Sequence, residues 1–165
     1  MKVLINAINY VKRSGISQEL LFFLGFVLIT VVLTFPWLLY FDRGVYGYGH
    51  PFYVIWRFWW NGFSAANGLN PGFTQFVGAP DGSAVTDLVD PVLPFLLGNL
   101  LNGIIRHPVI AYNIIVFLSF PLSGYFSFLL FRRLTGKHLI SFFFALIYSF
   151  YPYHLAHLVQ LSLAS

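Results

Sequence analysis

Hydrophobic residues in this chain form long runs that are separated by short polar stretches. The run at residues 20–41 contains 22 residues and no Asp, Glu, Lys or Arg. A helix rises about 1.5 Å per residue, so this run is long enough to cross a hydrocarbon layer of roughly 30 Å. Similar runs at residues 108–131 and from 139 to about 152 and onward predict two more spans. The pattern predicts an all-α membrane protein.

Residues 42–90 interrupt this pattern with charges, turn residues and aromatic residues, and we expect them to form an external loop. Pro51 suits the first turn of a helix, and the spacing of the aromatic residues predicts an amphipathic helix over 51–66 that lies in the membrane interface. Asn67-Gly68 ends this helix, and Ala79-Pro80-Asp81-Gly82 is typical of a β-turn. The aromatic stripe contains Phe52, Ile55, Trp56, Trp59, Trp60 and Phe63, and the opposite face carries His50, Val54, Arg57, Asn61 and Ser64.

Residues 91–105 form an apolar segment of only 15 residues, and it contains three Pro or Gly residues in addition to Pro91, namely Pro94, Gly98 and Gly103. The distribution of positive charge favours a re-entrant or interfacial helix over a full crossing, because cytoplasmic loops are rich in Lys and Arg. Without a crossing, the cytoplasm holds Lys2, Lys12, Arg13, Arg132, Arg133 and Lys137, and the outside holds Arg43, Arg57 and Arg106. With a crossing, four basic residues lie inside and five outside, against the usual bias.

The two ends of the chain differ in character. Residues 1–19 carry three basic residues around a modest apolar patch, and either a short surface helix or a cytoplasmic tail fits them. With these charges inside, the N-terminus lies in the cytoplasm. The last residues are still apolar at Ser165, which suggests the N-terminal part of a larger multi-pass protein.

Composition supports the membrane assignment and excludes several classes of site. Hydrophobic residues make up 58% of the 165 residues and charged residues only 8%, which does not suit a surface that faces water. The net charge is +4, and the basic residues lie at the edges of apolar runs. We interpret them as signals that set the orientation of the chain in the membrane, and we exclude nucleic acid as a partner. The absence of cysteine excludes disulfides, thiolate metal sites and a cysteine nucleophile.

Taken in order, several short motifs resemble the multi-spanning glycosyltransferases of the GT-C type and their bacterial glycosyltransferase-like relatives. The resemblance covers most of the chain from Thr34 onward and rests on the order and spacing of the motifs. The matching stretches are Thr34-Phe35-Pro36, Gly49-His50-Pro51, Gly78-Ala79-Pro80-Asp81-Gly82, Asp90-Pro91 with Pro94, Pro108-Val109-Ile110-Ala111-Tyr112-Asn113, Arg132-Arg133-Leu134-Thr135-Gly136, and Tyr151-Pro152-Tyr153-His154-Leu155-Ala156-His157.

This resemblance implies a GT-C-like helix bundle in a bacterial plasma membrane, with an active site on the outer face. It implies a lipid-linked sugar donor, a polyprenyl phosphate, and a lipid or glycan acceptor. In such proteins an acidic residue usually stands just before the first helix of the external loop, whereas this chain has His50 there. A noncatalytic protein that binds or transports a lipid-linked glycan is the alternative, and a purely structural subunit is a third.

The candidate catalytic residues are His50, Asp87 and Asp90. The positive end of the helix dipole disfavours a charged imidazole, so His50 would be able to accept a proton from the acceptor. The alternative is that His50 only caps the helix. Asp87 and Asp90 are the substitutes for the missing acid and would hold Mg²⁺ or Mn²⁺ if a metal is used, although Asp90 also fits a simple N-cap and no metal motif is present.

Arg57 and Asn61 lie on the polar face of the loop helix and are candidates for binding the donor phosphate. A guanidinium binds phosphate through paired hydrogen bonds, but an arginine here would equally contact ordinary lipid phosphate. His154 and His157 are three residues apart and share a helix face, which suits either substrate contact or a structural role. Asp42 is expected to form an ion pair with Arg43, and Asp81 is expected to stabilise the β-turn in which it lies.

Overall fold

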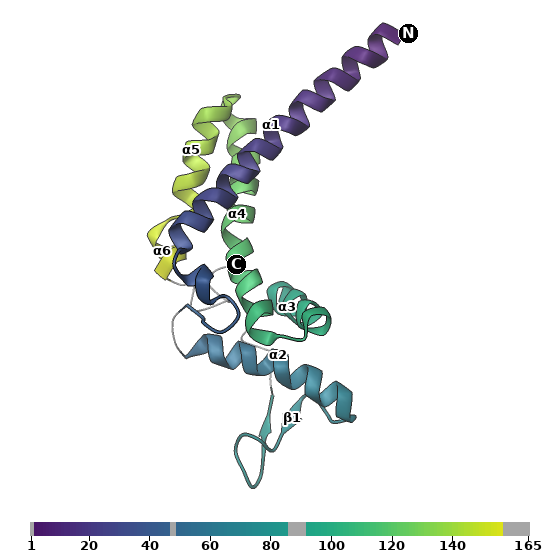
Figure 1. Cartoon of the computed structure of the whole chain (residues 1–165), viewed down its shortest axis with the longest axis vertical. Coiled ribbons are helices and arrows are strands. Elements are labelled where there is room, and N and C mark those ends of the chain that lie inside the picture. The colour runs from purple at the N-terminus through teal and green to yellow at the C-terminus, as the bar shows by residue number, and fades with distance from the viewer. Residues whose placement is uncertain (1, 47–48, 86–91, 157–165) are drawn as a thin grey trace. The chain divides into compact units, whose positions relative to one another are not determined.

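A computed structural model describes residues 2–46, 49–85 and 92–156, with side-chain environments from residue 18 to residue 154 within these ranges. The described chain is mostly helical, in agreement with the predicted all-α class (Figure 1). A two-stranded hairpin of β1 (Phe73–Thr74) and β2 (Ser83–Ala84) is the exception. It pairs Phe73 with Ala84 in antiparallel register.

The N-terminal helix α1 (Lys2–Thr34) is continuous, whereas the sequence suggested a separate segment before residue 20. It also ends earlier than the expected span at 20–41. Pro36 explains the early end, because the residue before a proline avoids helical backbone angles and proline has no N–H to donate. A short 3-10 helix, η1 (Trp37–Tyr40), follows.

Helix α4 (Pro108–Thr135) has 28 residues and is long and apolar enough to cross a membrane. At about 1.5 Å per residue it measures about 42 Å, more than the roughly 30 Å of hydrocarbon. Only 28% of its most apolar window is buried within the structure, unlike the core helix of a water-soluble protein. The expected helix at 108–131 is therefore confirmed, and it continues for one more turn.

The predicted third span is interrupted. Helix α5 (His138–Ser149) has 12 residues, and α6 (Pro152–Ala156) begins after a break at Phe150 and Tyr151. Pro152 provides the reason, because it disfavours a helical conformation at Tyr151 and suits the first turn of a new helix. At about 18 Å, α5 alone is shorter than the hydrocarbon layer.

The described chain divides into two compact units, and the first contains Met1–Phe35 with Phe120–Tyr151. Phe26, Phe128 and Ala145 form its core, one residue from each of α1, α4 and α5. Gly124 lets α1 approach α4, since a Cβ there would lie 2.5 Å from the ring of Phe26. Arg132 donates a hydrogen bond of 2.7 Å to Glu19 within this unit.

The second unit contains Pro36–Ser119 with Pro152–Ser165, and helices α2 (His50–Asn67) and α3 (Val92–Ile105) pack together in it (Figure 1). The predicted helix at 51–66 is thus confirmed to within one residue at each end. Gly68 ends α2 in the left-handed conformation, with φ of 65°. Gly98 of α3 allows close packing, because a Cβ there would meet the Phe58 ring.

The hairpin covers part of the aromatic stripe of α2. Trp60 donates a hydrogen bond of 2.9 Å from Nε1 to the carbonyl of Pro71 and is only 2% exposed. Phe76 from the hairpin loop meets the rings of Trp59, Trp60 and Phe63 edge-on, with centroids 5.8 to 6.0 Å apart. The stripe was expected to face lipid as a whole. In the structure, its centre faces the protein's own hairpin.

Asn113 connects α4 to the segment that follows η1. Its Nδ2 donates hydrogen bonds of 2.8 Å to the carbonyls of both Phe41 and Gly44. The side chain is fully buried, and Trp37 adds a longer hydrogen bond to Gly44. The amide of Asn113 therefore holds residues 41–44 against the start of α4, and the ring of Phe41 adds an edge-on contact with Phe117.

Candidate functional site

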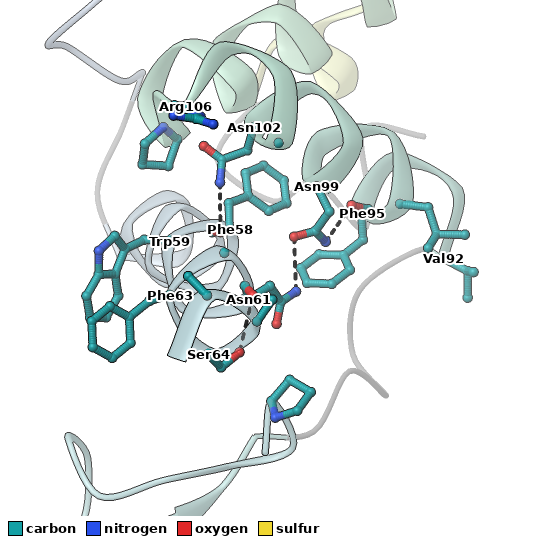
Figure 2. A pocket seen from close by; sticks show the side chains of 17 residues that line it. Phe58, Trp59, Asn61, Phe63, Ser64, Val92, Phe95, Asn99, Asn102 and Arg106 are labelled. Atoms are coloured by element: carbon teal, nitrogen blue, oxygen red, sulfur yellow. Dashed lines mark hydrogen bonds between the residues drawn. The ribbon is translucent and has the colours of Figure 1, made fainter. Parts of the chain in front are cut away.

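A cavity of about 1090 Å³ opens between α2 and α3, and 17 residues line it (Figure 2). Those from α3 follow one face, because Val92, Phe95, Asn99 and Asn102 recur every three or four residues, and Arg106 follows directly after the helix. The second half of α2 forms the other wall. The volume is slightly above the usual range for small-molecule sites, which is roughly 300 to 1,000 Å³.

Three amide side chains that line the cavity, those of Asn61, Asn99 and Asn102, form hydrogen bonds within and between its two walls. Asn61 donates a hydrogen bond of 3.0 Å to Oδ1 of Asn99, and Asn99 donates 2.9 Å to the carbonyl of Phe95. Asn102 donates 2.8 Å from Nδ2 to the carbonyl of Phe58 (Figure 2). These bonds fix the two helices to each other and hold three amide groups in defined orientations.

One acceptor in this group has no hydrogen bond within the described part of the chain. Oδ1 of Asn102 is buried, and the residue as a whole is 9% exposed. A buried acceptor without a donor costs about 1–3 kcal/mol, so the position favours a ligand or an ordered water that supplies one.

Arg106 stands at the end of α3 and lines the cavity with an exposed side chain. Its φ is 57°, and its N–H donates 2.7 Å to the carbonyl of Asn102. Glycine or asparagine usually fills such a left-handed position, because a larger residue pays roughly 1–2 kcal/mol there. The backbone therefore does not select arginine at this position.

Aromatic rings complete the lining. Trp59 and Phe63 stack with centroids 5.0 Å apart, and Phe58 packs against Phe95 at 5.5 Å (Figure 2). Rings beside amides offer a ligand both apolar faces and hydrogen-bonding groups. A sugar ring, which has apolar C–H faces and a belt of hydroxyls, matches such a wall, and Arg106 matches an attached anion.

Of the two predicted phosphate-binding residues, only Asn61 lines this cavity. Arg57 was expected on an open polar face, yet it is 1% exposed and its guanidinium lies 5.3 Å from the centre of the Phe95 ring. The reason is the packing of α3, which covers the polar face of α2 that the sequence left open. A role for Arg57 in phosphate binding stays a prediction, and this burial places its guanidinium away from the open surface.

His50 begins α2, but Gly49 with φ of 80° is the cap residue. The ring of His50 is half-buried and lies 6.2 Å from that of Tyr53. It does not line the cavity, and eight residues of helix separate it from Phe58, or about 12 Å at 1.5 Å per residue. Its proposed role as a base remains untested.

Three of the candidate residues, Asp87, Asp90 and His157, lie outside the described residues. Asp42 and Arg43 approach to 4.0 Å on the surface, as expected, and Asp81 lies in the hairpin loop. Across the described ranges, no three His, Asp or Glu side chains are arranged to bind a metal ion.

His154 lies in α6, where its Nε2 is 3.4 Å from the hydroxyl of Ser119. This contact suits the structural alternative given above for the histidine pair. Its predicted contact with substrate remains a prediction.

Sequence reasoning missed Asn99, Asn102 and Arg106 as site residues. Their spacing of three and then four residues was a usable signal, because it places them on one helical face. Asn99 and Asn102 were not selected as candidates, and Arg106 was counted only among the positive charges on the outside. The sequence did not reveal the site because its two walls, α2 and α3, are about forty residues apart in the chain.

The comparisons with known proteins give no relative: no family model, no curated protein and no solved structure matches this chain.

Proposed function

We propose that this protein is a multi-pass membrane glycosyltransferase that transfers a sugar from a polyprenyl-phosphate donor to a lipid or glycan acceptor on the outer face. The cavity between α2 and α3 is the observation that carries the proposal. It combines stacked rings, three amide side chains and one guanidinium, which suit the sugar and the phosphate of such a donor.

A protein that uses a membrane-bound donor needs to reside in the membrane, and α4 supports this requirement by its length and composition. Gln18–Thr34 and α3 are shorter apolar helices, and α5 exposes several large apolar residues, among them Leu139, Phe143 and Ile147. Exposed apolar side chains on several helices favour contact with lipid or with further helices. The multi-pass arrangement is part of the proposal.

In the proposed reaction, a base takes the proton of an acceptor hydroxyl while its oxygen attacks the anomeric carbon of the sugar. The bond from this carbon to the phosphate oxygen breaks, and the phosphate leaves with the electron pair. His50 is the candidate base, with Asp87 and Asp90 as alternatives. His50 does not line the cavity that would hold the donor, so the cavity supports donor binding and does not favour a particular base.

The test is sugar transfer by the full-length protein in nanodiscs, with a radiolabelled polyprenyl-phosphate hexose and a membrane extract as the source of acceptor. Transfer of label to a product of altered mobility is the expected result. A His50→Ala protein that keeps full activity would remove His50 from the mechanism. A protein that binds the donor but produces no labelled product with any extract would contradict the enzymatic proposal.

A noncatalytic protein that binds or transports a lipid-linked glycan is the second candidate. Among the described residues that line the cavity, none carries a carboxylate, whereas amides and rings suffice for binding alone. This function predicts donor binding with no turnover. Movement of the labelled donor between the leaflets of a proteoliposome would identify it.

A further inference from the structure

The cavity between α2 and α3 has one basic side chain among its described lining residues, that of Arg106. The residue that the sequence analysis selected for phosphate, Arg57, is buried beside Phe95. Arg106 in contrast is exposed and reaches the cavity from the end of α3 (Figure 2). An anion in this cavity would therefore meet Arg106.

The backbone conformation at Arg106 is a second indication, independent of charge, that its side chain has a role in binding. The chain turns from α3 into α4 through this residue with φ of 57°, held by the hydrogen bond from its N–H to Asn102. Glycine would make the same turn without strain. An arginine at a position that favours glycine indicates that its side chain is needed, because strained residues concentrate at binding sites.

A second group in the same wall of the cavity points to a ligand. Asn102, one turn before Arg106, has a buried Oδ1 with no hydrogen bond within the described residues. Figure 2 shows this oxygen on the side of the amide that faces Arg106. Arg106 follows the last residue of α3, and its N–H is bonded to the carbonyl of Asn102, so the two residues are neighbours in one wall of the cavity and one ligand would meet both. The ligand needs an anion for Arg106 and a donor such as a hydroxyl for Asn102.

We propose that Arg106 and Asn102 form the recognition site for a sugar phosphate, with the phosphate on the guanidinium and a hydroxyl of the adjacent sugar donating to Oδ1 of Asn102. This inference rests on the proposed function, because it assigns the donor's head group to named residues. Rings of the α2 wall, Trp59 and Phe63, contact the sugar face. The phosphate diester of a lipid-linked sugar and the monoester of a free sugar phosphate share this chemistry.

The experiment measures binding to the full-length protein in nanodiscs of neutral lipid, by calorimetry and by thermal unfolding. The probes are glucose 1-phosphate, mannose 1-phosphate and galactose 1-phosphate, with the corresponding neutral methyl glycosides and inorganic phosphate beside them. A second arm uses a polyprenyl-phosphate hexose in the bilayer, and a third uses phosphatidylglycerol. The two lipid arms distinguish a lipid-linked sugar from an ordinary anionic head group.

Arg106→Gly is the decisive variant, and Arg43→Gly, which removes an exposed arginine away from the cavity, is its matched control. Arg106→Gly is expected to weaken sugar phosphate binding at least tenfold, while its midpoint of thermal unfolding stays the same or rises. Arg106→Lys is expected to retain part of the affinity, and Asn102→Leu to bind inorganic phosphate normally but sugar phosphates several-fold more weakly. Arg43→Gly is expected to bind as the wild type does.

Three results would overturn the inference: unchanged binding in Arg106→Gly, a lower unfolding midpoint in that variant, or phosphatidylglycerol binding as tightly as the sugar lipid. The proposed function fails separately. Sugar transfer that persists in Arg106→Gly with unchanged donor affinity would contradict this binding site but not the transferase function. Tight donor binding by the wild type that depends on Arg106, with no sugar transfer, would support the site and contradict the transferase function.

Discussion

At the scale of single residues, two glycines of α3 occupy opposite environments. A Cβ at Gly98 would lie 2.1 Å from Cζ of Phe58, whereas nothing lies within 4 Å of one at Gly103. Phe58 is fully buried and Gly98 is buried beside it, so the ring has little room to move. The contact between α2 and α3 therefore depends on the absence of a side chain at residue 98.

We predict that Gly98→Ala lowers the stability of the α2 and α3 pair by about 1–3 kcal/mol, the typical cost of overpacking. Gly103→Ala, the matched control in the same helix, should raise it by about 0.5–1 kcal/mol through helix propensity. Thermal unfolding followed by tryptophan fluorescence measures both. The same effect in both variants would be inconsistent with the packing, as would a stabilised Gly98→Ala protein.

Asn113 gives a second prediction at this scale. Its amide supplies hydrogen bonds to the part-buried carbonyls of Phe41 and Gly44, so Asn113→Ala removes this donor from both and leaves Gly44 only the longer bond from Trp37. We expect a loss of about 1–3 kcal/mol and faster hydrogen exchange in residues 41–46. Asn67→Ala, which removes an exposed amide that bonds to Phe63, should change neither. Unaltered exchange in the 41–46 peptide would refute this role.

At the scale of elements, the hairpin is attached to α2 mainly through one ring. Phe76 is 64% exposed, yet it contacts three rings of the α2 stripe edge-on. The strands themselves contain only two residues each, too few to be stable alone. The packing of Phe76 and the bond from Trp60 to Pro71 hold the hairpin in place.

We therefore predict that Phe76→Ala releases the hairpin from α2, since edge-on aromatic pairs contribute about 0.5–1.5 kcal/mol each. Tryptophan emission should shift to longer wavelength as Trp59 and Trp60 gain solvent, and the 75–82 loop should be cleaved faster by protease. Val77→Ala, at a neighbouring position that is 50% exposed, is the control. Identical emission and cleavage in the two variants would mean that Phe76 is not the anchor.

At the scale of the whole molecule, membrane topology is the property that the positive charges predict. The chain has no cysteine, so single introduced cysteines report sidedness without background. We expect Leu69→Cys and Ile104→Cys to react with an impermeant maleimide from outside the cell, and Lys137→Cys only after permeabilisation. All three side chains are exposed in the structure, Ile104 by 80%. Labelling of Ile104→Cys only from inside would mean that 91–105 crosses the membrane and would reverse the placement of Arg132 and Arg133.

The sequence alone predicted the helices at 51–66, 91–105 and 108–131 and the turn at Asp81, because apolar periodicity and the positions of Pro and Gly act locally. It failed where two local signals competed. The apolar run 20–41 outweighed Pro36, and the run from 139 outweighed Pro152, although each proline ends a helix in the structure. Runs of hydrophobic residues reveal affinity for lipid and say less about helix continuity.

The candidate site was only partly predictable. The sequence selected the right helix, α2, and one residue that lines the cavity, Asn61. Tertiary structure decided the rest, because the packing of α3 buried Arg57 and brought Asn99, Asn102 and Arg106 opposite α2. Periodicity identifies which face of a helix is polar, but which partner covers that face depends on contacts between residues about forty positions apart.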